Sequence, residues 1–294
     1  MASLRETRKK IKTVKSTQQI TKAMKMVSAP RLRQAQARIL QARPFAIKMR
    51  EMLTDLAGRV ITDESADAPA LLPHPLFKKN DSKKAGLLLV TSDKGLCGSF
   101  NTNLIKKAAE FISHDPGQEV HFYIVGRKGR DFFKRSGFDL KGEYVQIINT
   151  LSYKHAEIIG EDLMNAYVNE GMSEVTVIYN EFKSVVQQKL TAERLLPIER
   201  PAKISNEIEG DFIYEPKREE LLAALMPRYV KSQVYRILME SCAAELGARM
   251  AAMDSASKNA KELIELLTLR LNRSRQAIIT REIAELVGGA EALK

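Results

Sequence analysis

Residues 4–32, LRETRKKIKTVKSTQQITKAMKMVSAPRL, decide the fold of this chain. From Leu4 onward, residues at alternating steps of three and four form one series that runs on to Leu56. This spacing predicts a long helix with a coiled-coil seam that is apolar at its ends and polar from Gln18 to Ser28. A helix from Met1 to Arg59 would be roughly 85 Å long, so it needs a partner. The predicted seam consists of Leu4, Thr7, Ile11, Val14, Gln18, Thr21, Lys25, Ser28, Leu32, Ala35, Ile39, Ala42, Ala46, Met49, Leu53 and Leu56.

Two prolines lie inside this first helix, Pro30 and Pro44. Each removes a backbone donor and crowds the preceding turn, which costs about 3 kcal/mol in a helix interior. The seam keeps its register across both positions. We therefore predict kinks at these prolines rather than breaks.

The partner of the first helix lies at the other end of the chain. Steps of four and three recur there, shift phase once and then resume, which indicates locally changed winding of one long helix. Two terminal helices around an inserted domain pack most simply as an antiparallel coiled coil. The predicted second seam is Val230, Val234, Ile237, Ser241, Ala244, Ala248, Ala251 and Ser255, followed by Ile264, Leu267, Leu271, Ser274 and Ile278.

The middle of the chain alternates short apolar runs with helical patterns. Strands are predicted at 86–91, 120–126 and 144–148, helices at 101–111, 128–136 and 155–169, and a closing antiparallel pair at 175–182 and 188–196. This order predicts a Rossmann-like α/β domain with a mainly parallel sheet. The fold class is thus α/β plus long helices. The expected divisions are the helix 1–60, a linker 61–84, the α/β domain 85–200, a linker 201–215 and the helix 216–294.

The chain carries a net charge of +11, and its excess positive charge lies at the N-terminus. Residues 1–60 hold 15 Lys and Arg residues against three acidic ones, of 47 and 36 in the whole chain. Cys97 and Cys242 form no CxxC motif, which favours a reducing compartment without a structural disulfide. No run reaches the roughly 18 apolar residues of a membrane span. A transit peptide is considered for the Arg-rich start, but the seam is already in register at Leu4, so we expect a mature N-terminus.

No catalytic constellation is found. The loop 93–99, DKGLCGS, lies between a strand and a helix but matches neither phosphate-binding glycine motif, so a structural turn is favoured over a nucleotide site. The basic turn 126–129 is interpreted in the same way. Cys97 is expected to be a small buried residue. The histidines have no metal-ligand spacing. No catalytic, cofactor or metal site is therefore expected from His74, His114, His121 or His155.

The basic first helix leaves several functions open. A solvated face is the default interpretation, and nucleic acid, a membrane surface or an acidic protein are the functional alternatives. No aromatic residues are interleaved with the charges, no helix-turn-helix is visible, and the apolar stripe before Phe45 lacks an aromatic anchor. An acidic protein partner is favoured.

Three blocks of sequence resemble the gamma subunits of F-type ATP synthases, in their bacterial form. The resemblance covers the whole chain in order. The chain lacks the cysteine-bearing insertion of the chloroplast form. The matching segments are SLRE (3–6), RKKI (8–11), TQQITKAMKMVS (17–28), TSDKGLCGSFN (91–101), MDSASKNA (253–260), NRSRQAIITREI (272–283) and VGGA (287–290).

This resemblance implies a non-catalytic rotary shaft. Its partners would be the alpha and beta subunits, the epsilon subunit and the membrane c-ring, with no nucleic acid, no cofactor and no insertion into the membrane. The protein would lie at the cytoplasmic face of the bacterial inner membrane. Residue by residue, Met24 and Lys25 resemble the segment that faces the beta subunits, and Arg249 a basic contact beside it. The other carried-over positions are the catch, Arg275, Gln276 and Thr280; the coupling position Glu285; and the bearing tip, Val287 to Leu293.

Two rival functions stay open at this point. A basic coiled-coil adaptor would bind nucleic acid or acidic proteins, and nucleic-acid binding would weaken steeply with salt. A small-molecule enzyme in the α/β domain would bind nucleotides in a calorimetric titration. The rotary shaft is favoured over both.

Overall fold

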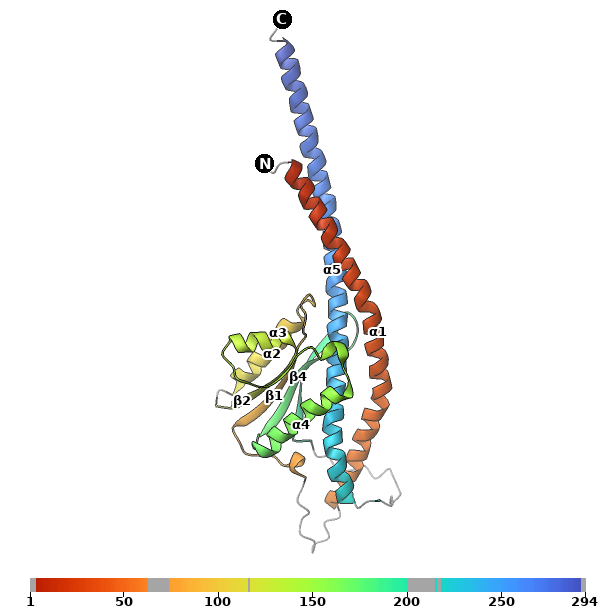
Figure 1. The fold of residues 1–294 in the computed structure, drawn as a ribbon, viewed down its shortest axis with the longest axis vertical. Coiled ribbons are helices and arrows are strands. Elements are labelled where there is room, and N and C mark those ends of the chain that lie inside the picture. Colours follow the sequence, from red (N-terminus) through yellow and green to blue (C-terminus); the bar gives the residue numbers. More distant parts are fainter. Residues whose placement is uncertain (1–3, 63–73, 116, 200–214, 216–217, 292–294) are drawn as a thin grey trace. The chain divides into compact units, whose positions relative to one another are not determined.

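The computed structural model describes residues 4–62, 74–115, 117–199, 215 and 218–291 (Figure 1). In the described parts, no helix has the length and apolar character needed to cross a membrane. The chain forms two compact units: Met1–Pro30 with Arg249–Lys294, and Arg31–Ala248. The elements are α1 (Leu4–Thr62), η1 (Pro75–Phe77), β1 (Lys84–Val90), α2 (Phe100–His114), β2 (Glu119–Val125), α3 (Arg127–Arg135), β3 (Leu140–Tyr144), η2 (Ile148–Thr150), α4 (Tyr153–Asn169), β4 (Glu174–Phe182), β5 (Gln188–Leu196) and α5 (Arg218–Glu291).

The predicted first seam is confirmed along α1. Every seam position from Leu4 to Leu53 is buried or half-buried, and α1 continues through both Pro30 and Pro44. No break occurs at either proline, and the kinks stay a prediction. The side chain of the last predicted seam residue, Leu56, lies outside the described residues.

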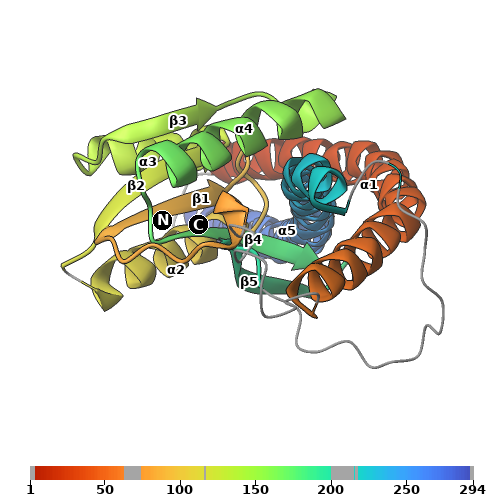
Figure 2. The same cartoon turned by 90° about the horizontal axis from the view of Figure 1, so that it is seen from below.

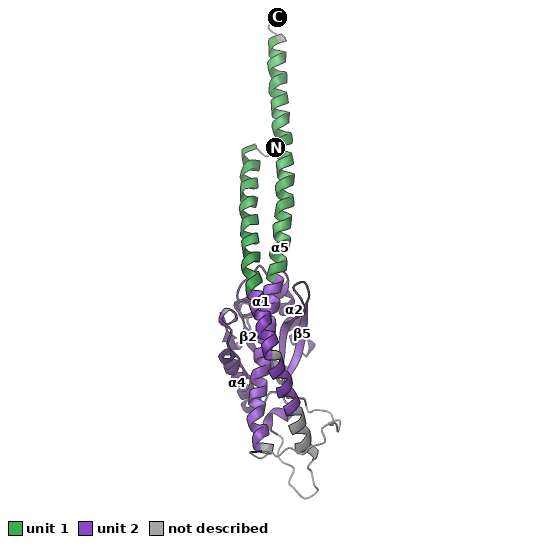
Figure 3. Ribbon diagram, turned by 90° about the vertical axis from the view of Figure 1, so that its right-hand side faces the viewer, with its two compact units in different colours: residues 1–30, 249–294 green, residues 31–248 purple. Residues whose placement is uncertain are grey.

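In the unit of residues 1–30 and 249–294, the two helices run antiparallel. Gln18 Nε2 donates to the Ser257 carbonyl at 3.5 Å, and Lys25 pairs with Asp254, so numbers rise along α1 while they fall along α5. Figure 3 shows these two segments side by side in green. The predicted antiparallel coiled coil is therefore present.

The phase shift on α5 lies earlier than predicted. Ser255 is exposed, and Met253 is buried in its place. The new phase continues through Ala260, Ile264, Leu267 and Leu271, which are buried or half-buried. The seam expected at Ser274 and Ile278 is wrong, because every residue from 272 to 290 is exposed. Apolar spacing continues there, but it marks a face that this chain itself does not cover.

The unit of residues 31–248 is built on a five-stranded sheet in the order β3-β2-β1-β4-β5. β1 pairs in parallel with β2 and β4, β2 pairs in parallel with β3, and β5 is antiparallel to β4. Parallel pairs need crossover helices, and α2, α3 and α4 supply them. The predicted fold class, including its closing antiparallel pair, is confirmed.

Helices cover both faces of the sheet (Figure 2). The side chains of β1 alternate: Leu87 and Leu89 join one apolar cluster with α2 and α3, whereas Leu88 and Val90 join another with α4. The second cluster also takes Met49 of α1 and Val230 of α5. Thus Met49 and Leu53 of α1 and the α5 residues from Leu222 to Leu238 pack on the α4 side of the domain, whereas Ala244 of α5 joins the cluster of α2 and α3.

The third strand differs from the prediction. It covers Leu140–Tyr144 rather than 144–148, and η2 begins at Ile148. β3 is an edge strand that alternates half-buried and exposed residues, so it shows no continuous apolar run. The apolar residues after it follow a turn in which Gln146 has a φ of 63°. Residues 63–73 of the predicted linker 61–84, and 200–214 of the linker 201–215, lie outside the described residues.

Candidate interaction surface on the paired helices

Two of the four polar residues in the middle of the α1 seam are satisfied within their own helix. Thr21 and Ser28 are buried, and their hydroxyls donate to the carbonyls of Gln18 and Met24 at 3.0 and 2.9 Å. Small hydroxyl residues that bond back to the preceding turn can face a seam without leaving a buried donor unpaired. These two side chains therefore serve the packing of α1 against α5, and a partner would have to contact other positions.

Lys25 lies beside an acidic residue that sequence reasoning did not select. Its ammonium group forms an ion pair with the Asp254 carboxylate on α5. That carboxylate also pairs with the ammonium group of Lys258 at 3.1 Å. The hydrogen bond from Lys25, and then that from Lys258, lower the pKa of Asp254 below its ordinary range. The three residues leave one net positive charge at this level. Asp254 belongs to the segment 253–260, one of those that resemble the gamma-subunit family. Only the register of the two helices, however, brings it to Lys25.

An apolar stripe borders Met24 on the outside of α1. Ile20, Met24 and Val27 follow one another at steps of four and three, so they share a face of the helix. Ile20 and Val27 are 58% and 55% exposed, and Met24 is half-buried. Large exposed apolar groups in an otherwise basic helix indicate a surface that a partner covers. The sequence shows the spacing of Ile20, Met24 and Val27, but the seam of the same helix is the longer pattern.

The predicted residues on α5 fall into two groups. Arg249 is half-buried and lies five positions before Asp254, about 7 Å along the axis. Arg275 lies 21 positions after Asp254, about 30 Å further along. The structure therefore groups Arg249 with Met24 and Lys25, and it does not bring Arg275, Gln276, Thr280 or Glu285 to them.

The end of α5 is a helix with an uncovered apolar face. Ile279, Ile283 and Leu286 share one face by their spacing and are all exposed, as is Val287 beside them. Arg275 and Gln276 lie on this same face, one turn earlier, by the same spacing. Figure 3 shows the segment extending past the beginning of α1. Glu285 lies on another face, where it pairs with Arg281 at 3.2 Å, and Leu293 lies outside the described residues.

Hydrogen bonds from side chains in and after the loop that follows β1 connect it to the segments that follow β2 and β3. Asp93 Oδ1 accepts from the backbone N–H groups of Arg127 and Gln146 at 3.1 and 3.0 Å. Asn101 Oδ1 accepts from the Ser92 N–H at 3.0 Å, and its amide lies 3.3 Å from the sulfur of the buried Cys97. A carboxylate at the first turn of α3 opposes the approach of an anion to that turn. These contacts support a structural role for the loop 93–99.

A close approach explains the glycine at the start of α3. Gly126 has a φ of +92°, and a Cβ there would lie 2.3 Å from the Thr91 carbonyl oxygen. The basic turn 126–129 is therefore set by packing against β1. Within the described ranges, no cluster of three His, Cys, Asp or Glu side chains is arranged to hold a metal ion.

The chain matches known proteins along its whole length. A family model described as ATP synthase matches residues 3–293. The ATP synthase gamma chain of Desulfitobacterium hafniense is 45% identical over 100% of both chains. The ATP synthase gamma chain of Solibacter usitatus is 45% identical over 99% of both.

Solved structures show the same fold. A chain of the central stalk and c-ring of the Tetrahymena thermophila mitochondrial ATP synthase is 28% identical, with a TM-score of 0.61 over 81% of this chain and 99% of that one. A chain of the rotor of the Euglena gracilis mitochondrial ATP synthase is 18% identical, with a TM-score of 0.64 over 94% of this chain and 98% of that one. The second likeness concerns the fold alone.

Proposed function

This chain belongs to the ATP synthase gamma chain family, and we propose that it is the central shaft of a rotary ATP synthase. One observation of its structure carries the proposal: residues 272–290 of α5 are all exposed and carry an apolar face. Such a face is unfavourable in water and calls for a surrounding partner. A ring of alpha and beta subunits would supply one.

The proposed contacts form three levels along the unit of residues 1–30 and 249–294. Met24, Lys25 and Arg249 would meet the beta subunits at one level, together with the exposed Ile20 and Val27. Arg275, Gln276 and Thr280 would form a catch with a beta loop, and Glu285 would couple shaft to ring. Val287 and the following residues would turn in an apolar bearing.

Uneven charge and apolar exposure let such a shaft act on three beta subunits differently. A rotor shifts a conformational equilibrium only if its contact free energy differs between the two conformations. In this chain the net charge at Lys25, Asp254 and Lys258 lies at one level of the paired helices, while the apolar face of α5 lies some 30 Å or more away. Rotation would present these features to each beta subunit in turn.

The chain would contribute no catalytic group of its own. Nucleotide chemistry would take place in the beta subunits, and the unit of residues 31–248 would join the epsilon subunit and the c-ring. The chain would then be a peripheral protein at the cytoplasmic face of the inner membrane. The relatives and structures named above are all ATP synthase proteins, so none of them favours the nucleic-acid adaptor.

Reconstitution tests this proposal. The purified chain alone should hydrolyse no ATP, and mixing it with alpha and beta subunits should yield a complex with ATPase activity. Adding epsilon and the membrane sector should make that activity depend on the ion gradient. A chain that hydrolyses ATP alone, or that does not assemble with alpha and beta, would contradict the proposal.

A further inference from the structure

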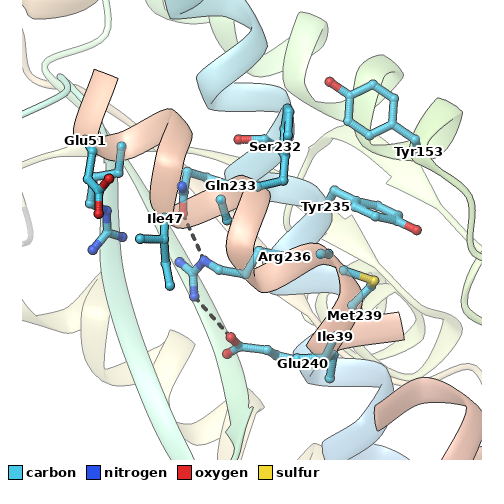
Figure 4. A pocket seen from close by; sticks show the side chains of 14 residues that line it. Ile39, Ile47, Glu51, Tyr153, Ser232, Gln233, Tyr235, Arg236, Met239 and Glu240 are labelled. Carbon is cyan, nitrogen blue, oxygen red and sulfur yellow. Dashed lines mark hydrogen bonds and ion pairs between the residues drawn. The ribbon is translucent and has the colours of Figure 1, made fainter. Parts of the chain in front are cut away.

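A cavity of about 530 Å³ lies between α1, α5 and the beginning of α4, in the unit of residues 31–248. Figure 4 shows side chains from all three helices around it. The volume is in the range of small-molecule sites, which are mostly apolar with a few polar groups. Its apolar lining includes Ala42, Phe45 and Ala46 of α1, Met239 of α5, and the rings of Tyr153 and Tyr235.

The charged residues of the lining balance one another. They are two arginines and two glutamates: Arg50 and Glu51 of α1, and Arg236 and Glu240 of α5. Arg50 and Glu51 are neighbours in the sequence and are both exposed. Arg236 and Glu240 form an ion pair at 3.4 Å. A charged ligand therefore finds no net attraction in this cavity, and it would lose hydration on entering an apolar space.

The polar atoms of Arg236 and Glu240 are occupied or out of reach. Arg236 Nε donates to Gln233 at 2.9 Å, and Nη2 donates to both Glu193 oxygens at 3.0 and 2.9 Å. Nη1 donates to the Tyr179 hydroxyl at 3.2 Å and, more weakly, to Glu240 Oε1 at 3.4 Å. Glu240 Oε2 has no hydrogen-bond partner among the described residues, but it is fully enclosed, so a ligand in the cavity does not contact it.

Gln233 brings an open donor to the same wall. The residue lines the cavity and is 3% exposed. Its Oε1 atom accepts from Arg236 Nε, which fixes the orientation of the amide. Nε2 carries two N–H donors and has no hydrogen-bond partner in the described parts of the chain, yet it is not enclosed as Glu240 Oε2 is. A buried donor without an acceptor is costly, and a ligand that accepts from it would remove that cost.

The surroundings of Gln233 favour a flat apolar molecule. Ser232, the preceding residue, also lines the cavity, but its hydroxyl donates to the Tyr229 carbonyl at 2.7 Å and has no hydrogen left for a ligand. Tyr153 and Tyr235 pack edge to face, with ring centroids 5.6 Å apart. Aromatic rings of a ligand can pack against such side chains in offset or edge-to-face arrangements.

We propose that this cavity binds an uncharged, mainly apolar molecule that carries a carbonyl group, such as an aromatic ketone. The carbonyl oxygen accepts from Gln233 Nε2, and the rings occupy the space between the α1 residues and the two tyrosines. This site is separate from the proposed partner contacts, and it does not depend on the rotary function.

Methionine methyl NMR on the full chain tests the site. The chain has 11 methionines, so a [methyl-13C]methionine spectrum is sparse. Met239 lines the cavity, whereas Met172 is fully buried in the core beside the sheet and serves as an internal reference. The variants Met239→Leu and Met172→Leu assign the two signals. We expect 1-indanone at pH 7 to shift the Met239 signal in a saturable way and to leave the Met172 signal unchanged.

Three analogues of the same bicyclic shape separate the contribution of the carbonyl group from that of charge. Indane lacks the carbonyl group and measures the apolar contribution alone. At pH 7, 2-aminoindane is protonated and indane-2-carboxylate is ionised, so the two carry opposite charges. Each charged analogue should bind at least about tenfold more weakly than 1-indanone, because neither finds an opposite charge that is not already balanced.

Variants of the cavity wall test the hydrogen bond. Gln233→Leu removes the donor without adding a charge, and Gln233→Glu replaces the amide N–H groups by a carboxylate oxygen. Both should weaken 1-indanone binding about fivefold or more and leave the affinity for indane within about twofold. Ser232→Ala is the matched control on the same wall and should change neither affinity, because its hydroxyl is bound within α5.

One further variant tests whether the probes occupy this cavity. Ala42→Leu should abolish the binding of both 1-indanone and indane, because it fills the space without a change of charge. In every variant an unshifted Met172 signal reports that the chain is folded.

Three results would overturn the proposal. The first is a Met239 signal that no concentration of 1-indanone shifts. The second is a pair of Gln233 variants that weaken 1-indanone no more than indane, which would mean that the amide does not bind the carbonyl group. The third is a charged analogue that binds more tightly than 1-indanone. If the Gln233 variants do not fold, the comparison of the charged and uncharged probes on the original chain still decides.

Discussion

The ammonium group of Lys25 on α1 pairs with the carboxylate of Asp254 on α5, although 229 positions separate them in the chain. Both lie in the unit of residues 1–30 and 249–294. The pair marks the level at which the two helices face each other. It also shows that Lys25 is bound within the chain before any partner approaches it.

The Asp254 pair predicts a pH dependence of stability. Its folded-state pKa lies below the ordinary value of 3.8, so the unfolded chain binds a proton more readily. The stabilisation is therefore present above pH 3.8 and lost as the pH falls through the folded-state pKa. Asp254→Asn should remove this part of the pH dependence and change stability little at pH 7, because the pair is partly exposed. Chemical unfolding followed by circular dichroism at pH 7 and pH 3 measures both; an unchanged pH dependence in the variant would contradict the assignment.

Met24→Lys should impair coupling more than it destabilises the chain. The substitution adds a charge to the apolar stripe of Ile20, Met24 and Val27, which we propose as a beta contact. The matched control is Met26→Lys, because Met26 is 63% exposed and lies on nearly the opposite side of the same helix.

Proton pumping driven by ATP in reconstituted vesicles should fall in Met24→Lys and stay near normal in Met26→Lys. Thermal unfolding of each chain alone gives the stability. Equal pumping in both variants, or a loss of thermal stability in Met24→Lys with normal pumping in the surviving complex, would disprove this contact.

Ile283→Lys should leave the isolated chain stable and weaken its assembly. Ile283 is 55% exposed on a helix face that this chain does not cover, so its replacement should alter the free energy of unfolding by less than about 0.5 kcal/mol. A lysine buried by the alpha and beta subunits at this face would be costly. The control Ala284→Lys adds the same charge outside the stripe of Ile279, Ile283 and Leu286. Analytical ultracentrifugation with alpha and beta subunits should show less complex only for Ile283→Lys, and equal assembly would argue against a partner that covers this face.

Gly126→Ala should destabilise the unit of residues 31–248 more than Gly137→Ala does. Both glycines have positive φ values, +92° and +83°, which cost an alanine about 1–2 kcal/mol. Only at Gly126 would the new Cβ also lie 2.3 Å from the Thr91 carbonyl oxygen, whereas the space at Gly137 is open. Urea unfolding should therefore give a loss clearly above 2 kcal/mol for Gly126→Ala. Similar losses in both variants would show that the close approach is unimportant.

Local periodicity predicted much of this fold. The seam of α1 and the strands β1, β2, β4 and β5 each depend on residues near in sequence, and their burial follows the predicted pattern. β3 was misplaced, because an edge strand with one solvated face has no apolar run. The shift at Met253 was placed one turn too late, because small residues such as Ser255 fit either side of a helix.

The sequence by itself determined the long helices, the parallel sheet and the family, because helical and strand periods and motif blocks are local properties. Only the tertiary structure decided which distant groups meet. The Lys25–Asp254 pair, the buried hydroxyls of Thr21 and Ser28, and the unpartnered Oε2 of Glu240 depend on the register between elements far apart in the chain. Register is set by the packing of whole faces, and no single stretch of sequence contains it.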